Sequence, residues 1–225
     1  MIYAIGDSFT EGGELPGQDF GIPGKGAWPE VLSNLINKPV TNLGRSASGN
    51  TRIVKRAIDC VIDNADGIII CWTAHNRTEF ADQFGIYDVW PGRDSRWWLT
   101  TKSGSEHRIE LVKYLTNHHN QDHYYANWLR QIILVQNLCK SKNIPCAMFL
   151  AFGSDDFNVY KHKENIKKLI EEIDLNLFVN NTLTESTVDW TYGTLKGLGG
   201  HPLEKGHQII ANKIYEHIRH LGWIS

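Results

Sequence analysis

The chain has 225 residues, 41% of them hydrophobic and 21% charged, which is ordinary for a globular protein with a sizeable core. Its formal net charge of -2 gives no electrostatic reason to expect nucleic acid or an anionic membrane as a partner. No apolar run is long enough to span a bilayer, and Met1 leads straight into an apolar segment without room for a signal peptide. We therefore expect a cytoplasmic protein.

The first apolar run, residues 2–5, predicts a buried strand that stops at Gly6. Asp7 and Ser8 follow at once, which would place the Ser8 hydroxyl at the carboxyl edge of a sheet, where open α/β sheets bind ligands. Asp-Ser after a strand is also ordinary turn chemistry and a good helix N-cap, so the stretch alone leaves both interpretations open. We expect Asp7 to hydrogen-bond the loop and hold the Ser8 turn in place.

Apolar runs and helical periodicity then alternate along the chain, which predicts a doubly wound, three-layer α/β fold with a mostly parallel sheet. A loop rich in glycine and proline at 12–26 is typical of a flexible rim beside a site. Asp122 is a plausible N-cap for the helix that follows it. We expect strands at 2–5, 39–43, 67–72, 144–152 and 175–179, and helices at about 27–36, 51–63, 122–141, 160–173 and 201–221.

Residues from about 77 to 122 break this alternation, because a compact α/β domain does not need so many residues between a strand and its helix. We interpret them as an insertion in a single domain spanning 1–225, partly helical near 109–114, that covers or lines the site. An aromatic-rich cap with its own small core is the alternative for most of its aromatic residues. The candidate substrate-binding residues of the insertion are Trp90, Arg93, Trp97 and Trp98.

Neither the cysteines nor the clustered histidines indicate a metal site. The cysteines form no Cys-x-x-Cys pair and lie in apolar contexts, so we expect buried free thiols, as in a reducing compartment. His118, His119 and His123 have no second set of ligands at a fixed spacing, so we interpret them as surface histidines. We expect no metal and no other cofactor. The cysteines are Cys60, Cys71, Cys139 and Cys146.

Four stretches resemble, in order, the sequence blocks of the SGNH (GDSL) hydrolase family. Residues 6–12 resemble the nucleophile block, and residues 41–51 resemble the glycine block. Residues 68–76 resemble the strand that ends in the family's asparagine, and residues 200–207 resemble its His-Pro block. The resemblance implies a flavodoxin-like fold with five central strands, and it covers nearly the whole chain.

The resemblance also implies a nucleophile and its oxyanion donors. Ser8 would attack the acyl carbon, and its backbone N–H would be one donor to the oxyanion. The Gly49 N–H would be the second donor, with Gly44 as the fallback because the spacing is longer than the family's. The Asn76 amide would be the third donor. His75 is the alternative there, but an amide is a permanent neutral donor, whereas a histidine must be in the right protonation state.

His201 would be the general base, but the family's acid, three residues before the histidine, is replaced by Leu198. Three alternatives follow. A backbone carbonyl near Leu198 could leave a Ser-His dyad, a carboxylate from elsewhere such as Asp189 or Glu204 could substitute, or the protein could be weakened or inactive. Since a base needs its tautomer set, we expect Nδ1 of His201 to face a carbonyl or a carboxylate distant in sequence. His207 is interpreted as structural.

The hypothesis that follows is a cofactor-free serine esterase, working through an acyl-enzyme on Ser8. Because the insertion is rich in tryptophan and arginine and poor in long aliphatic side chains, we expect it to remove a small, acetyl-like group from a polar or carbohydrate ester. The alternative is an inactive SGNH scaffold that acts as a binding or assembly protein. A nucleotide-binding flavodoxin-like protein is disfavoured, since no Gly-x-Gly-x-x-Gly fingerprint or phosphate loop occurs.

Overall fold

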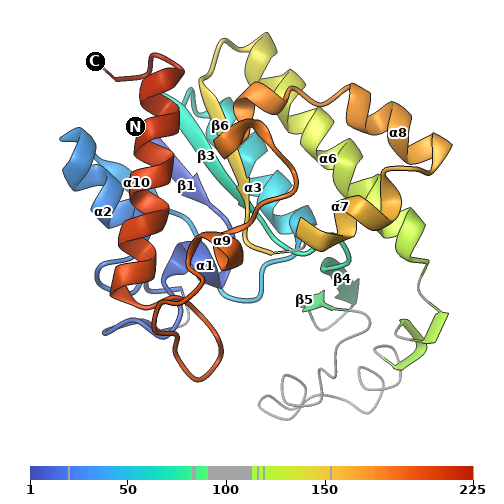
Figure 1. The fold of residues 1–225 in the computed structure, drawn as a ribbon, viewed down its shortest axis with the longest axis horizontal. Helices are drawn as coiled ribbons and strands as arrows, with labels where there is room; N and C mark the ends of the chain where they lie inside the picture. The colour runs from blue at the N-terminus through green and yellow to red at the C-terminus, as the bar shows by residue number, and fades with distance from the viewer. Residues whose placement is uncertain are drawn as a thin grey trace.

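A computed structural model of the chain describes residues 1–19, 21–82, 85–90, 113–115, 117–118, 120–152 and 154–224. Four parallel strands form its central sheet, in the spatial order β2-β1-β3-β6. Figure 1 shows this sheet between two groups of helices, with α2 and α10 on one side and α3, α6 and α8 on the other. The strands are β1 (Ile2–Ile5), β2 (Val40–Asn42), β3 (Gly67–Trp72) and β6 (Cys146–Leu150).

The middle strand β3 is buried along its whole length and divides its side chains between two cores. Ile68, Ile70 and Trp72 pack with the helices α3 and α6. Ile69 and Cys71 alternate with them and pack with α2 and α10. Because successive side chains of a strand point to opposite faces, a continuous apolar run suits a sheet that is covered on both sides. This arrangement confirms the predicted three-layer α/β fold.

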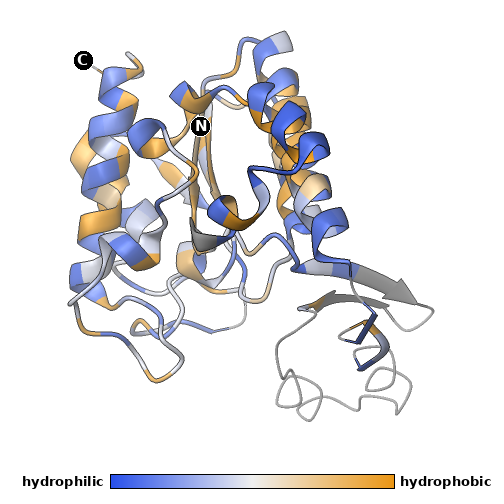
Figure 2. Ribbon diagram, turned by 45° about the vertical axis from the view of Figure 1, so that its right-hand side comes forward, coloured by the Kyte–Doolittle hydropathy of each residue, from blue (hydrophilic) through white to orange (hydrophobic). Residues whose placement is uncertain are grey.

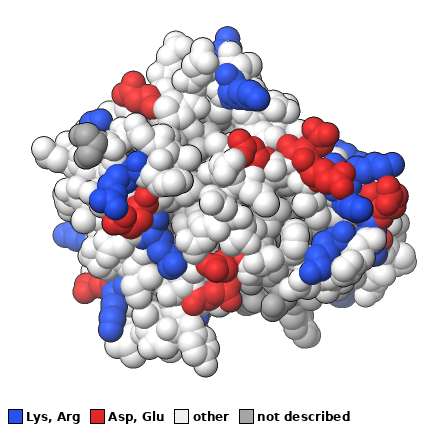
Figure 3. All heavy atoms as spheres, turned by 45° about the horizontal axis from the view of Figure 1, so that its top comes forward, with Lys and Arg blue, Asp and Glu red and all other residues white. Residues whose placement is uncertain are grey.

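The helices lie close to the predicted ranges, and they turn apolar residues toward the sheet and polar ones outward (Figure 2). On the face drawn in Figure 3, acidic and basic side chains are interspersed. The helices of the two outer layers and their connections are α1 (Ser8–Glu11), α2 (Trp28–Ile36), α3 (Asn50–Ile62), α6 (Gln121–Ser141), α7 (Ser154–Tyr160), α8 (Glu164–Glu171), α9 (Thr187–Trp190) and α10 (Glu204–His220).

The fifth strand predicted at 175–179 is wrong. The segment forms two short 3-10 turns, η1 (Leu175–Leu177) and η2 (Val179–Asn181), and only an isolated bridge links Phe178 to Met148 of β6. The Asp174 side chain accepts from the Asn176 N–H at 3.0 Å and so caps a turn where the strand would begin, and Asn180 and Asn181, which follow the segment, have left-handed φ of 62° and 55°. The described part of the sheet therefore has four strands.

Three predicted helix boundaries also need correction. The helix predicted at 160–173 is the shorter α8, and the helix α7, which was not predicted, precedes it across a turn at 161–163. The last helix begins at Glu204, because His201 precedes Pro202 and a residue before proline disfavours the helical conformation. The N-cap of α6 is Asn120, whose side chain accepts from the His123 N–H, and Asp122 lies inside the first turn.

The predicted insertion begins with an antiparallel hairpin, β4 (Thr78–Asp82) and β5 (Gly85–Val89), whose two strands form a sheet separate from the central one. Glu79 of this hairpin pairs with Arg52 of α3 at 3.1 Å and with Lys55 at 3.7 Å. Residues 91–112 and most of the predicted helix at 109–114 lie outside the described residues. Within the described ranges, no helix is both long and apolar enough to cross a membrane.

Candidate active site

Ser8 follows β1 after Gly6 and Asp7, as the first residue of the single-turn helix α1. Asp7 fixes this turn, because one of its carboxylate oxygens accepts from the Phe9 N–H at 3.0 Å. Its other oxygen accepts from the Thr73 hydroxyl at 2.7 Å and from the Arg77 guanidinium at 3.2 Å. Asp7 is fully buried, and these contacts confirm the prediction that it holds the Ser8 turn in place.

The structure brings Ser8 and His201 together at the carboxyl edge of the sheet. The ring Nε2 of His201 lies 2.8 Å from the Ser8 hydroxyl oxygen, although the two residues are 193 positions apart. The residue before His201 is Gly200, whose φ of 85° is a left-handed conformation that favours glycine. The Gly197 N–H donates to the His201 carbonyl at 2.9 Å and closes the turn that precedes the histidine.

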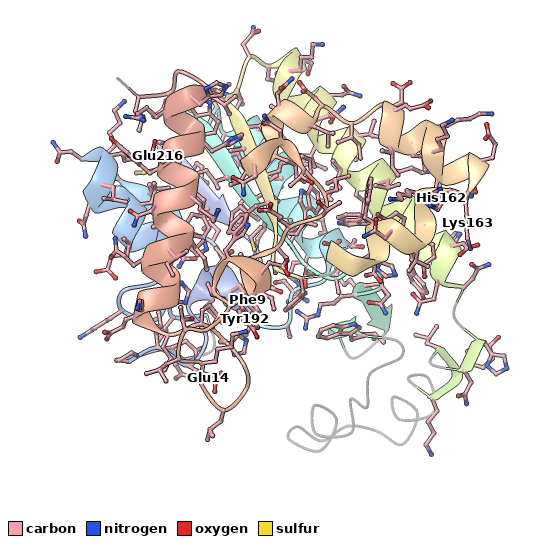
Figure 4. All side chains as sticks on the ribbon, in the orientation of Figure 1. Phe9, Glu14, His162, Lys163, Tyr192 and Glu216 are labelled. Atoms are coloured by element: carbon pink, nitrogen blue, oxygen red, sulfur yellow. The ribbon has the colours of Figure 1, made fainter. Side chains whose placement is uncertain are left out.

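The carboxylate of Glu14 takes the position opposite Ser8 on the imidazole ring. Its oxygen lies 2.8 Å from Nδ1 of His201 and also accepts from the backbone N–H of His201 at 3.2 Å. The second oxygen accepts from the Gly199 N–H at 2.6 Å. In Figure 4, Phe9 and Glu14 are drawn at the lower end of the molecule, where the loop before α10 projects. The expectation that Nδ1 faces a carboxylate distant in sequence is therefore confirmed.

Glu14 is a functional candidate that the sequence analysis missed, and the carboxylates it named do other things. Asp189 accepts from the backbone and the hydroxyl of Ser186, both at 2.7 Å, and so caps α9. Glu204 is exposed in the first turn of α10, and Leu198 is fully exposed at the tip of its turn. The signal that was available is an acid on the glycine-rich loop six residues after Ser8, but the family pattern gives that position no role.

Close packing explains the glycines around this acid. A Cβ at Gly197 would lie 2.5 Å from the Glu14 carboxyl carbon, and one at Gly199 would lie 3.0 Å from a Glu14 oxygen. A Cβ at Gly13 would lie 3.2 Å from the His201 ring. Glu14 itself has φ of 66°, which is strained for a residue with a side chain. The loops are therefore shaped so that carboxylate and imidazole meet.

The hydrogen bonds also set the charge of Glu14. Burial raises the pKa of Glu14. The hydrogen bonds from the Gly199 N–H and from His201, together with attraction to a positively charged His201 ring, outweigh burial and hold that pKa below its usual range. Glu14 is therefore ionised at neutral pH and accepts the Nδ1–H of His201. A neutral imidazole carries one proton. When that proton is on Nδ1 and donated to Glu14, Nε2 is unprotonated and faces Ser8.

The loops that carry the two remaining oxyanion candidates are fastened to each other and to the Ser8 turn. Gly49 is the N-cap of α3, and the next residue, Asn50, donates from its side chain to the Ala74 carbonyl at 2.8 Å. The Asn50 backbone N–H donates to the Arg77 carbonyl at 3.2 Å, and Asn76 lies between these two anchor points. Arg77 in turn contacts Asp7, so both loops are held against the nucleophile turn.

The two fallback donors are engaged elsewhere. The Gly44 N–H donates to the Asn42 side chain at 2.9 Å. His75 contacts the Asp156 carboxylate through Nδ1 and the Gln121 side chain through Nε2, each at 2.9 Å. The Gly44 N–H and both ring nitrogens of His75 therefore have partners within the protein.

Of the four candidate substrate-binding residues, only Trp90 is among the described residues, and Arg93, Trp97 and Trp98 lie outside them. The Arg77 guanidinium stacks on the Trp90 ring, 4.1 Å from its centre. Trp90 contacts Phe152 at a centroid distance of 5.6 Å, Phe152 contacts Phe9 at 4.9 Å, and Phe9 contacts the His201 ring at 5.3 Å. A row of aromatic rings therefore leads from the base to the start of the insertion.

His207 has a structural environment, as the sequence analysis expected. It is fully buried, and its Nδ1 accepts from the Trp28 N–H at 3.1 Å, which ties α10 to the start of α2. Burial and the nearby His201 lower the pKa of His207 to about 4, so the ring is neutral at neutral pH. The four cysteines are buried and free, as predicted. Across the described ranges, no cluster of three or more His, Cys, Asp or Glu side chains is placed to hold a metal.

Comparison with solved structures gives matches over nearly the whole chain. A G-D-S-L family protein from Desulfitobacterium hafniense matches 96% of this chain and 98% of its own at 15% identity, with a TM-score of 0.50. TesA matches 98% of both chains at 10% identity, with a TM-score of 0.56. The chain has the SGNH hydrolase fold.

An acetyl xylan esterase, Est2A from the rumen bacterium Butyrivibrio proteoclasticus, shares this SGNH fold. It matches 99% of this chain at 15% identity with a TM-score of 0.54, and this chain spans 64% of the Est2A chain. No family model matches the sequence, and no match is found among curated proteins. At such identities, the likeness establishes how the chain folds.

Proposed function

We propose that this protein is a serine esterase of the SGNH type that removes a small, acetyl-like group from a polar or carbohydrate ester. The observation that carries the proposal is the row Ser8, His201 and Glu14, with both ring nitrogens of His201 at 2.8 Å from their partners. A hydroxyl, a base with a free nitrogen and a carboxylate that orients the base are what acyl transfer to a serine requires.

In the acylation step, Nε2 of His201 accepts the Ser8 proton while the Ser8 oxygen attacks the acyl carbon. The resulting tetrahedral oxyanion would be stabilised by the N–H groups of Ser8 and Gly49 and by the Asn76 amide. The imidazolium then gives its proton to the leaving alcohol, and the acyl group stays on Ser8. In the deacylation step, a water molecule gives a proton to His201 and attacks the acyl carbon. The carboxylic acid product leaves, and Ser8 takes the proton back from His201.

Glu14 contributes through His201 and not by contact with the substrate. Its carboxylate holds the Nδ1–H, keeps the ring in the reactive tautomer and stabilises the positive charge that the ring gains in the transition state. Its position weighs against the alternative of an inactive binding scaffold, which was based on the missing acid at Leu198.

The substrate class is proposed from the surroundings of the pair. In the aromatic row, the part-exposed rings of Trp90 and Phe152 offer flat faces, which suit a sugar ring better than a long acyl chain. Arg93, Trp97 and Trp98 are the further candidates on the insertion. No metal or other cofactor takes part in this mechanism.

The test is hydrolysis of p-nitrophenyl acetate by wild type and by Ser8→Ala, together with labelling of the intact protein by a fluorophosphonate. We expect hydrolysis that Ser8→Ala abolishes, and a label on Ser8 alone. Equal rates for wild type and Ser8→Ala would overturn the proposal in favour of a binding protein. Acetylated xylan and a long-chain ester, assayed side by side, decide between a carbohydrate and a lipid substrate.

A further inference from the structure

Glu11 is a second carboxylate on the nucleophile helix, and it is fully buried. It lies one turn after Ser8 on α1. One of its oxygens accepts from the Ser46 N–H at 2.8 Å, from the Ser46 hydroxyl and from the Gln18 amide at 3.3 Å. The other oxygen accepts from the Gly21 N–H at 2.8 Å. A buried charge is costly unless it is fully hydrogen-bonded, and this one is bonded to two separate loops.

The first of these loops leads to the candidate oxyanion donor Gly49. Ser46 lies within a turn in which the Ser48 N–H donates to the Arg45 carbonyl at 3.1 Å, and Gly49 follows this turn at once. The Arg45 N–H donates to the Gly6 carbonyl, also at 3.1 Å. Glu11 and Gly6, on either side of Ser8, therefore both hold the segment that ends in Gly49.

Close approach of the backbones makes this attachment tight. A Cβ at Gly44 would lie 2.3 Å from the Glu11 backbone nitrogen, so the loop lies directly against α1 and no side chain fits between them. The Asn42 side chain adds a bond to the Thr10 carbonyl at 2.8 Å. The loop is thus attached to the helix at several points, and Ser46 with Glu11 is its charged attachment.

The second loop is the one that carries Glu14. Gln18 and Gly21 lie in the segment 12–26, and the Gly24 N–H donates to the Glu11 backbone carbonyl at 2.9 Å. Glu14 precedes these anchor points on the same loop. The side chain of Glu11 therefore lies between the loop of the oxyanion candidate and the loop of the acid, and it is bonded to both.

We propose that Glu11 is the positioning residue of this site, which sets the Gly49 N–H and the Glu14 carboxylate relative to Ser8. The inference rests on the proposed function. A carboxylate is needed because its partners include two backbone N–H groups on different oxygens. An amide at this position would turn its NH2 group toward one of them and leave two donors facing each other.

The experiment compares Glu11→Gln with Glu30→Gln in acetyl-ester hydrolysis, with kcat expressed per Ser8 titrated by fluorophosphonate. Glu30 is the matched control, because it is an exposed carboxylate that also accepts a loop N–H, that of Gly26 at 2.7 Å. We expect Glu11→Gln to lower kcat about 10- to 100-fold, somewhat less than the loss of one whole oxyanion donor, with KM within about twofold. Glu30→Gln should match wild type.

Normalising to titrated Ser8 separates positioning from folding, since a merely structural role would lower the titre and leave kcat per site unchanged. An unchanged kcat per site in Glu11→Gln, while Ser8→Ala is inactive, would overturn the inference and leave the proposed function standing. If Ser8→Ala equals wild type, both fail. Should Glu11→Gln not fold, Ser46→Ala decides. It removes one of the bonds and should lower kcat per site by a few-fold, and Ser46→Thr, which keeps the hydroxyl, should restore it.

Discussion

His201 and His75 each contact a carboxylate through Nδ1, and they differ in what the other ring nitrogen meets. Nε2 of His201 meets the Ser8 hydroxyl, whereas Nε2 of His75 meets the side-chain oxygen of Gln121. The His75 side chain is 7% exposed and packs against Tyr125 and Tyr160, with ring centres 5.3 and 5.7 Å away. The His201 side chain is 22% exposed.

A carboxylate-histidine pair can act as a general base only where its second ring nitrogen reaches a group that can lose a proton and attack. Gln121 offers a carbonyl oxygen, so the His75 pair joins the end of β3 to α6 and α7 and stabilises the fold. The His201 pair has the Ser8 hydroxyl beside it and is part-exposed, which is the arrangement that the proposed proton transfer needs.

Exchanging each histidine for alanine gives the largest contrast. We expect His201→Ala to lower kcat/KM by about 10⁴-fold or more, as triad knockouts do elsewhere. His75→Ala should keep activity within about tenfold and lose on the order of 2–4 kcal/mol of stability, from a cavity and two hydrogen bonds. Ester hydrolysis and thermal unfolding of both variants check this. A folded His75→Ala that is as inactive as His201→Ala would break the comparison.

The next largest effect is expected from neutralising the two carboxylates that contact these histidines, Glu14 and Asp156. In Glu14→Gln, the amide cannot accept from both the Gly199 N–H and the His201 ring as the two carboxylate oxygens do. We expect a loss of about 10²- to 10⁴-fold in kcat, toward the lower end because Glu14 is part-exposed. Asp156→Asn should change kcat by no more than a few-fold. Steady-state rates on one acetyl ester measure both, and a Glu14→Gln variant that loses no more than a few-fold would show that His201 does not depend on its acid.

A third histidine, His207, sharpens the comparison because it contacts no carboxylate but a backbone N–H. Its pKa falls from 6.5 to about 4 on folding, so the unfolded chain takes up a proton between those values and the folded chain does not. Stability is therefore complete above pH 6.5 and is lost as the pH falls toward 4, by on the order of 3 kcal/mol. Urea unfolding across this window checks it, and His207→Gln should remove this part of the pH dependence.

The smallest expected effect comes from restoring an aspartate where the family resemblance would place one. Leu198 is fully exposed at the tip of the turn 197–200, where the Gly200 N–H donates to the Gly197 carbonyl at 2.9 Å. A carboxylate there would point into solvent while Glu14 already faces His201. We therefore expect Leu198→Asp to stay within about twofold of wild type in kcat/KM. A clear gain in rate would show that Glu14 is a poor substitute.

The sequence predicts the layers of this fold well, because buried parallel strands read as continuous apolar runs such as residues 67–72. The sequence also predicts that Ser8 and His201 meet at one edge of the sheet, since both lie in recognisable blocks. The fifth strand was predicted wrongly because the apolar residues at 175–179 are typical of a strand. The turn capped by Asp174 and the left-handed asparagines at 180 and 181 show only in the structure. Propensity alone cannot show that a segment touches the sheet at single bridges only.

The role of Glu14 could not be predicted from the sequence, for a different reason. Its contact with His201 joins residues 187 positions apart, and it depends on backbone features at Gly13, Gly197 and Gly199 that only three-dimensional packing reveals. The network around Asp7 was predicted in kind, because Asp-Ser after a strand already predicts a capped turn. Its partners Thr73 and Arg77 come from another strand end and could not be named from local pattern.

The acid and the nucleophile stand six residues apart on one stretch of chain, and this has a consequence for the order in which the site is assembled. Ser8 and Glu14 are neighbours from the moment of synthesis, whereas the base arrives with the last helix, 193 positions after Ser8. The proposed triad therefore needs a long-range closure, which brings His201 to Ser8 as α10 docks on α2. During refolding, the rate at which hydrolysis returns would report the rate of that docking event.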